Sequence, residues 1–167
     1  RIPFTPAIAT CLLLVLCGDT AAAKESRPPN LVYIMADDLG YGDLGCFGQE
    51  TIKTPHLDKL ARGGMKFTSY YAGNTVCRPS RLALWTGKHM GHTPISSNAK
   101  YHFKPEDITV AELLKAKGYA TGGVGKWAMG GTGTSGHPNE NGFDFWFGYL
   151  DQGEAHNYYP THLWRNT

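Results

Sequence analysis

Apolar runs and apolar/polar alternation predict three strands in this chain. Residues 31–36 form an uninterrupted apolar and aromatic run, which is typical of a strand buried on both faces inside a parallel sheet. Residues 65–71 alternate between apolar and polar side chains, as a strand with one covered face does. Residues 119–127 predict a third strand, in which several glycines replace larger side chains.

Helical spacing marks residues 54–63. Thr54 stands at an N-cap position, Pro55 suits the first helical position, and Gly63 is a terminator. The apolar side of this helix is expected to consist of Leu57, Leu60 and Ala61.

Two further helices are predicted. Thr109 and Glu112 form a capping box at the start of a helix that ends at Gly118. The other runs from Pro79 to about Trp85, with Gly87 beyond its end. Residues 129–142 are rich in Gly, Ser, Thr and Asn and predict a long loop at the edge of the sheet.

Alternating strands and helices predict an α/β fold with a mostly parallel sheet and helices on both of its faces. The composition, 41% hydrophobic and 18% charged over 167 residues, is that of one globular domain or a part of one. The net charge of +2 comes without any block of like charges, which argues against a nucleic-acid partner.

Residues 1–23 have the pattern of a signal peptide. Arg1 precedes an apolar run from Ala7 to Leu16, and small residues ending at Ala23 supply an Ala-x-Ala cleavage site. The run is about half of the ~20 residues that span a bilayer, so no transmembrane segment is expected in the mature chain. These features predict an exported protein, periplasmic or secreted, whose domain covers residues 24–167.

Cys46 and Cys77 remain after removal of the signal peptide. In an exported protein they are able to form a disulfide, and this is the simplest alternative to a chemical role for Cys77. Cysteine and histidine spacing gives no zinc motif.

Cys77 lies just before the predicted helix that begins at Pro79. Free backbone N–H groups and the positive end of the helix dipole favour an anion there. Arg81, four residues after the cysteine, is able to reach the same anion. A Cys-x5-Arg phosphatase loop is excluded because Ala83 occupies the arginine position, whereas a thiol hydrolase with a histidine base stays open.

The run "CRPSR" at residues 77–81, followed by Thr86 and Gly87, resembles the signature of the type I sulfatases. The resemblance extends from about Asn30 to the last residue. It implies an alkaline-phosphatase-like α/β fold, truncated here on its C-terminal side. It also implies that a formylglycine-generating maturation enzyme oxidises Cys77 to formylglycine, whose hydrate attacks sulfate esters.

Asp37 and Asp38 follow the first predicted strand at its carboxyl end, where open α/β sheets bind ligands. Side chains of adjacent strand residues point to opposite faces, so both reach one ion only if the chain turns at once, which Gly40 and Gly42 permit. A solvated acidic turn is the alternative interpretation. The resemblance makes both aspartates ligands of Ca²⁺, or of Mg²⁺.

Lys126, in "GVGKWAMGG", matches the family lysine that contacts both the sulfate and formylglycine. The sequence departs from the family two residues later, where Ala128 stands in place of a frequent histidine. "AHNYYP" at residues 155–160 is similar to a stretch in bacterial-type members, and this places His156 among the substrate-binding residues. The aromatic residues Phe143, Phe145 and Trp146 are expected in the core.

The sequence therefore predicts a sulfuric ester hydrolase that acts on sulfate esters, a class that includes sulfated carbohydrates. Catalytic roles fall to Cys77, Arg81 and Lys126. Two alternatives stay open: a phosphodiesterase or phosphonate hydrolase of the same superfamily, and an inactive relative that binds sulfated glycans. The segments that complete the family's catalytic domain are expected beyond this chain, so the 167 residues alone are expected to be inactive.

Overall fold

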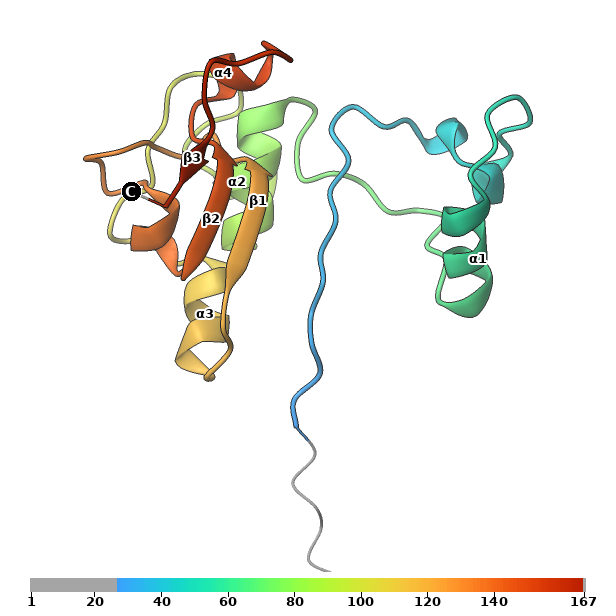
Figure 1. Cartoon of the computed structure of the whole chain (residues 1–167), viewed down its shortest axis with the longest axis horizontal. Coiled ribbons are helices and arrows are strands. Elements are labelled where there is room, and N and C mark those ends of the chain that lie inside the picture. The colour runs from blue at the N-terminus through green and yellow to red at the C-terminus, as the bar shows by residue number, and fades with distance from the viewer. Residues whose placement is uncertain (1–26, 167) are drawn as a thin grey trace, which may run out of the picture. The chain divides into compact units, whose positions relative to one another are not determined.

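The computed structural model describes residues 27–166 and is shown in Figure 1. The predicted signal peptide, residues 1–23, lies outside the described residues. The chain divides into two units between Ala36 and Asp37. None of the helices in residues 27–166 is both long enough and apolar enough to cross a bilayer.

Within the first unit, residues 27–36 form no regular secondary structure. The strand predicted for residues 31–36 is therefore wrong, and Val32 and Ile34 are 83% and 85% exposed. An apolar run indicates that a strand formed by these residues would have side chains to bury. The strand also needs hydrogen-bond partners on the backbone of a neighbouring strand. Within the described residues, the sheet comprises only three strands from the other unit.

The sheet of the second unit has the order β1-β2-β3, with β1 at Gly122–Lys126, β2 at Phe145–Tyr149 and β3 at Trp164–Arg165. β1 and β2 are parallel, whereas β2 and β3 are antiparallel, so the sheet is mixed. The strand predicted around Gly122–Lys126 is confirmed. Its glycines have a packing role: a Cβ on Gly123 would lie 2.4 Å from the Trp146 ring, so only glycine admits the indole.

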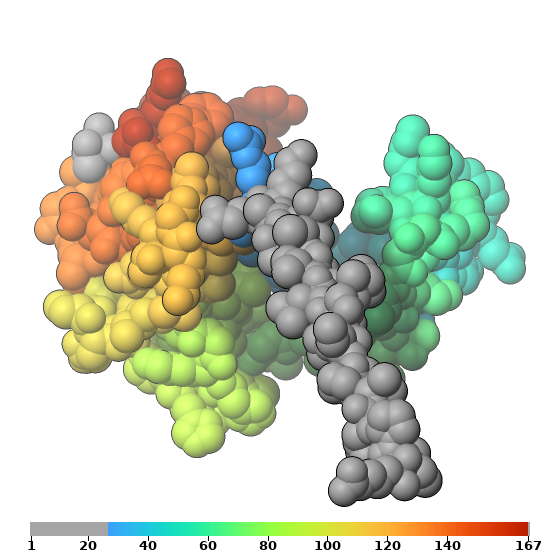
Figure 2. Space-filling view, turned by 90° about the horizontal axis from the view of Figure 1, so that it is seen from below, coloured from blue at the N-terminus to red at the C-terminus, as the bar shows by residue number. Residues whose placement is uncertain are grey.

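Three helices belong to the same body: α2 at Cys77–Thr86, α3 at Val110–Ala116 and α4 at Gln152–Ala155 (Figure 1). The predicted capping box of α3 is confirmed, because Thr109 and Glu112 exchange side-chain and backbone hydrogen bonds. α2 ends at Gly87 as predicted, in the left-handed conformation with φ 65°. In the space-filling view of Figure 2, the green-to-red segments that carry these elements form a continuous packed mass.

Helix α1, Pro55–Gly63, is also confirmed, but Thr54 does not cap it. Its hydroxyl instead donates to Asp58 Oδ1 at 3.0 Å and accepts from the Gly45 N–H at 2.8 Å. This ties α1 to the short 3₁₀ turn η2 (Gly45–Phe47), which follows another such turn, η1 (Tyr41–Asp43). Leu60, on the predicted apolar side, is 71% exposed.

The strand predicted for residues 65–71 is wrong, since this segment consists of coil and bends. Its large apolar side chains are exposed, among them Met65 at 80% and Tyr71 at 83%. Alternation defines two faces, but within the described part of the chain neither face is covered here.

Trp127 is the centre of the core, with no exposed surface. Its indole N–H donates to the Gly136 carbonyl at 2.7 Å, which anchors the predicted 129–142 loop and its turn η4 (Pro138–Asn141). A second short turn, η3, spans Met90–His92. Four aromatic rings surround the Trp127 indole at centroid distances of 5.1–5.6 Å: Trp85, Phe103, Phe143 and Trp146.

The expected core positions of Phe143 and Trp146 are confirmed, because they are 6% and 1% exposed. The expectation for Phe145 is wrong, since it is 37% exposed. β2 alternates between its faces, so Phe145 and Trp146 point to opposite sides and only one of them meets the core.

Trp127→Ala is expected to lower the free energy of unfolding by about 3–5 kcal/mol, because it removes a fully buried indole and leaves a cavity. Tyr159→Ala is the matched control, since Tyr159 is 92% exposed and its removal should cost less than about 0.5 kcal/mol. Urea unfolding followed by tryptophan fluorescence measures both. Equal effects of the two changes would contradict this account of the core.

Candidate active site

Cys77 is the first residue of α2, so this helix begins two residues earlier than predicted. Val76 precedes it in an extended conformation, with φ −129°. Pro79 is accommodated in the first turn because backbone N–H groups there have no intrahelical partner to lose. Cys77 thus stands at the positive end of α2, where the Arg78 N–H already donates to Asn98 Oδ1 at 3.0 Å and the Ser80 N–H donates to the Val76 carbonyl at 3.1 Å. The helix dipole and the nearby guanidinium of Arg81 are therefore the features that favour an anion there.

The structure leaves both Cys46 and Cys77 as free thiols. The alternative of a disulfide between them is therefore not realised. Cys77 is partly exposed, which leaves its side chain accessible to a reactant.

Two arginines fasten α2 to the segment that leaves β1. Arg81 donates through Nη1 to the Lys126 carbonyl, and Arg78 donates through Nε to the Ala128 carbonyl at 2.9 Å. Both are buried, with 8% and 6% of their surface exposed. Because they are three residues apart, they lie on one side of α2 and hold Cys77 in a fixed place beside the end of β1.

Sequence reasoning assigned no role to Arg78. Its Nη1 also donates to the carbonyls of Asn98 and Ala99, at 2.9 and 2.8 Å. The signal available was the i, i+3 spacing to Arg81, but the carbonyl partners are distant in sequence and no local pattern reveals them.

Asp37, Arg81 and Lys126 meet at one point. Lys126 Nζ lies 2.5 Å from Asp37 Oδ2, and Arg81 Nη2 lies 3.6 Å from the same oxygen. The side chains of Lys126 and Arg81 are 7% and 9% exposed, whereas that of Asp37 is 45% exposed. Two buried cations therefore converge on a partly open carboxylate.

Burial alone would raise the pKa of Asp37, but the hydrogen bond and charge of Lys126 and the charge of Arg81 outweigh it and lower the pKa. Burial lowers the pKa of Arg81, while the neighbouring Asp37 and Cys77 act in the opposite direction. Arg81 also has a buried Nε without a hydrogen-bond partner. Arg81 thus retains one N–H donor that is not used by the groups around it.

Asp38 has a positive φ of 60°. The chain turns at this residue, directly after Asp37, and Gly40 has an ordinary φ of −78°. The predicted turn is present, but Asp38 makes it instead of the glycines. Asp is among the few residues that tolerate this region, and such a conformation is common where function constrains the backbone.

Asp37 and Asp38 offer hard carboxylate oxygens, which suit a divalent cation of the Ca²⁺ or Mg²⁺ type. Among residues 27–166, however, no group of three or more His, Cys, Asp or Glu side chains converges as a metal site. Ca²⁺ takes six to eight oxygens, so these two aspartates supply only part of such a coordination sphere.

His156 is the residue that caps the C-terminus of α4. Its charge is the smallest of the causes that lower the pKa of Asp37. A cavity of about 390 Å³ adjoins this region and is lined by both Arg78 and Ala128. Its wall also includes polar and aromatic side chains from three further segments: Lys100, Tyr101, His102, Asp151, Glu154 and Trp164.

The structure therefore brings together three of the predicted site residues, from segments far apart in sequence: Asp37, Arg81 and Lys126. Cys77 begins the helix that carries Arg81. The fold that positions them is of the alkaline-phosphatase-like α/β class. A family model described as "Sulfatase" matches residues 29–165. The chain belongs to the sulfatase family.

Named relatives agree with this assignment. Steryl-sulfatase of Mus musculus is 42% identical over 156 residues, which is 84% of this chain and 25% of the relative. Arylsulfatase A of Homo sapiens is 49% identical over 124 residues, 71% of this chain and 24% of the relative. A solved structure described as a complex with its substrate D-glucosamine-2-N,6-O-disulfate has a TM-score of 0.70 at 30% identity, covering 84% of this chain and 27% of that one. The chain spans about a quarter of the length of these proteins.

Proposed function

We propose that the natural protein is a sulfuric ester hydrolase in which Cys77 is the precursor of the nucleophile. The observation that supports this most directly is the convergence of Arg81 and Lys126 beside the residue that begins α2. Two buried cations at a helix N-terminus suit a sulfate group with its negative charge.

Chemistry favours a modified Cys77 over the thiol. A thiolate that attacks sulfur would keep a sulfur–sulfur bond with no simple exit. A formylglycine hydrate carries two hydroxyls on one carbon: one attacks sulfur and expels the alcohol, and deprotonation of the other then expels sulfate and restores the aldehyde. The conversion of the thiol requires a maturation enzyme and an oxidant, which are partners of the natural protein in this proposal.

Arg81 and Lys126 hold the reacting groups. Lys126 would bind a sulfate oxygen and the nucleophile, and the unpartnered Nε of Arg81 would provide a further donor. Arg81 is held by its hydrogen bond to the Lys126 carbonyl, and the Lys126 ammonium is held by its ion pair with Asp37, so little reorganisation is needed when charge develops on the sulfate oxygens.

Asp37 and Asp38 would hold a divalent cation, which we propose is Ca²⁺, together with ligands from outside this chain. Such an ion supplies positive charge to a sulfate oxygen and favours the deprotonated nucleophile. Asp37 would in addition orient the Lys126 ammonium, which it contacts directly.

The organic part of the substrate would occupy the cavity of about 390 Å³ that Arg78, Ala128 and Trp164 line. Carboxylates of Asp151 and Glu154 are able to accept hydrogen bonds from sugar hydroxyls, and the Trp164 indole offers an aromatic surface. These groups favour a sulfated carbohydrate, with His156 as a further contact. The relative with bound glucosamine disulfate supports the same substrate class.

Export to the periplasm or the extracellular space completes the proposal, on the basis of the N-terminal sequence pattern. A test of the reaction class uses the natural protein matured in a host with the formylglycine-generating enzyme. We expect it to hydrolyse 4-nitrophenyl sulfate with a kcat/KM above that for 4-nitrophenyl phenylphosphonate. A reversed preference would make it a phosphonate hydrolase, and absence of both activities would contradict the proposed enzyme.

A further inference from the structure

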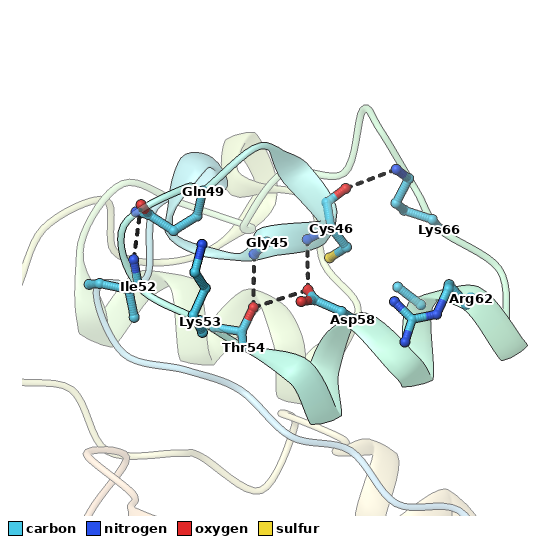
Figure 3. Close-up of a pocket in the computed structure, with 10 residues that line it drawn as sticks. Gly45, Cys46, Gln49, Ile52, Lys53, Thr54, Asp58, Arg62 and Lys66 are labelled. Carbon is cyan, nitrogen blue, oxygen red and sulfur yellow. Dashed lines mark hydrogen bonds between the residues drawn. The ribbon is translucent and has the colours of Figure 1, made fainter.

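A second cavity of about 390 Å³ lies between η2 and α1, and its residues come entirely from positions 45–66 (Figure 3). None of the residues assigned to the active site lines it. Figure 3 shows Lys53, Arg62 and Lys66 among the side chains around it, together with Asp58 and Cys46.

The charge of this lining is unbalanced, because it contains three cations and one carboxylate, that of Asp58. The carboxylate is already engaged: Asp58 Oδ1 accepts from the Cys46 N–H at 2.7 Å and from the Thr54 hydroxyl at 3.0 Å. Asp58 therefore joins η2 to α1, and fewer of its oxygen lone pairs remain free to face the cavity.

The cations are held in place without a counter-ion. Lys66 Nζ donates to the Cys46 carbonyl at 2.9 Å and lies 5.5 Å from the centre of the Phe47 ring. Lys53 Nζ donates to the Glu50 carbonyl. Among residues 27–166, the ion pairs involve other cationic residues, so none of the three cavity cations is neutralised by a carboxylate.

We propose that this cavity is a second anion-binding site, which takes a sulfate group on a polysaccharide at a distance from the bond that is cleaved. Ammonium and guanidinium groups form charge-assisted hydrogen bonds to the oxygens of an oxyanion. A concave surface lined by one sign of charge also raises the local concentration of a polyanion. The choice of a sulfated polysaccharide rests on the proposed function, whereas the anion site itself rests on the charges of the lining.

The test measures binding of a chondroitin sulfate oligosaccharide to the natural protein by isothermal titration calorimetry. The triple variant Lys53→Gln, Arg62→Gln and Lys66→Gln is expected to raise the dissociation constant about tenfold, because each exposed charge contact contributes only a small part of the binding free energy. The loss should shrink at high salt, because these contacts are screened. Turnover of 4-nitrophenyl sulfate should not change, since this small substrate occupies the active site and does not extend to the second cavity.

The matched control removes three exposed lysines that do not line the cavity, by Lys59→Gln, Lys104→Gln and Lys117→Gln. It should leave the affinity within about twofold. Arg62→Gln alone guards against a folding defect, because the Arg62 side chain makes no hydrogen bond or ion pair within the described part of the chain. This single change should still weaken binding measurably.

Three results would overturn the inference: equal losses in the two triple variants, equal affinity for unsulfated chondroitin, or tighter binding of polyphosphate than of the sulfated oligosaccharide. Failure of the proposed function is separate from these outcomes. A protein without sulfatase turnover whose binding still depends on Lys53, Arg62 and Lys66 would retain the anion site.

Discussion

Cys77→Ala is expected to lower kcat/KM for 4-nitrophenyl sulfate at least about a thousandfold in the matured natural protein. The substitution removes the atom that becomes the nucleophile, and loss of a covalent nucleophile leaves only the contribution of binding and charge. The fold should persist, because Cys77 contributes backbone geometry at the start of α2 and its thiol makes no disulfide.

The control for this change is affinity for inorganic sulfate, measured as competitive inhibition in the wild-type protein and as direct binding in the variant. Arg81 and Lys126 stay in place, so the dissociation constant should change by less than about threefold. Retention of near-normal turnover by Cys77→Ala would exclude the nucleophile assignment.

Lys126→Met is expected to reduce kcat about a hundredfold to a thousandfold, the usual effect of removing one preorganised donor to a developing oxyanion. The methionine keeps most of the apolar length of a side chain that is 7% exposed. It also removes the ammonium 2.5 Å from Asp37, so the pKa of Asp37 should rise toward its ordinary value.

Lys117→Met is the matched control, because Lys117 is exposed at the end of α3. This substitution should leave kcat unchanged. Steady-state kinetics over a range of substrate concentrations separates kcat from KM. An increase in KM with an unchanged kcat would show that Lys126 binds substrate and transition state equally, against the role given to it here.

Local patterns predicted the elements whose determinants are local. The capping box of Thr109 and Glu112 begins α3 where the sequence places it, and Gly87 ends α2 in the left-handed conformation that glycine favours. β1 was predicted around its glycines, and the structure explains them by the Trp146 ring against Gly123. In each case the residues that determine the conformation lie within a few positions of one another, or the segment has a distinctive composition, such as the glycines of β1.

Elements that depend on distant partners were missed. The 31–36 and 65–71 segments have the composition of strands, but pairing requires neighbours that the described residues do not supply. The capping role expected of Thr54 was lost to Asp58 and Gly45, because a hydroxyl has several partners of similar strength to choose from.

The candidate site divides in the same way. Cys77, Arg81 and Lys126 were assigned from motif resemblance, and Arg81 and Lys126 both form ion pairs with Asp37 in the structure. The catalytic roles of all three stay predictions. The role of Arg78 was not predicted, because its hydrogen-bond partners are backbone carbonyls. Every residue has a carbonyl, so the sequence does not show which ones Arg78 contacts. The positive φ of Asp38 was also missed, because the glycines nearby appeared to be the natural place for the turn.

The most direct test of the central claim is mass spectrometry of the peptide that contains Cys77, from natural protein matured in a competent host. We expect a residue in which the thiol sulfur has been replaced by an aldehyde oxygen, which hydrazide labelling also detects. The peptide that contains Cys46 serves as the internal reference and should keep its thiol. Unmodified thiol at both positions, in protein that nevertheless hydrolyses sulfate esters, would contradict the claim.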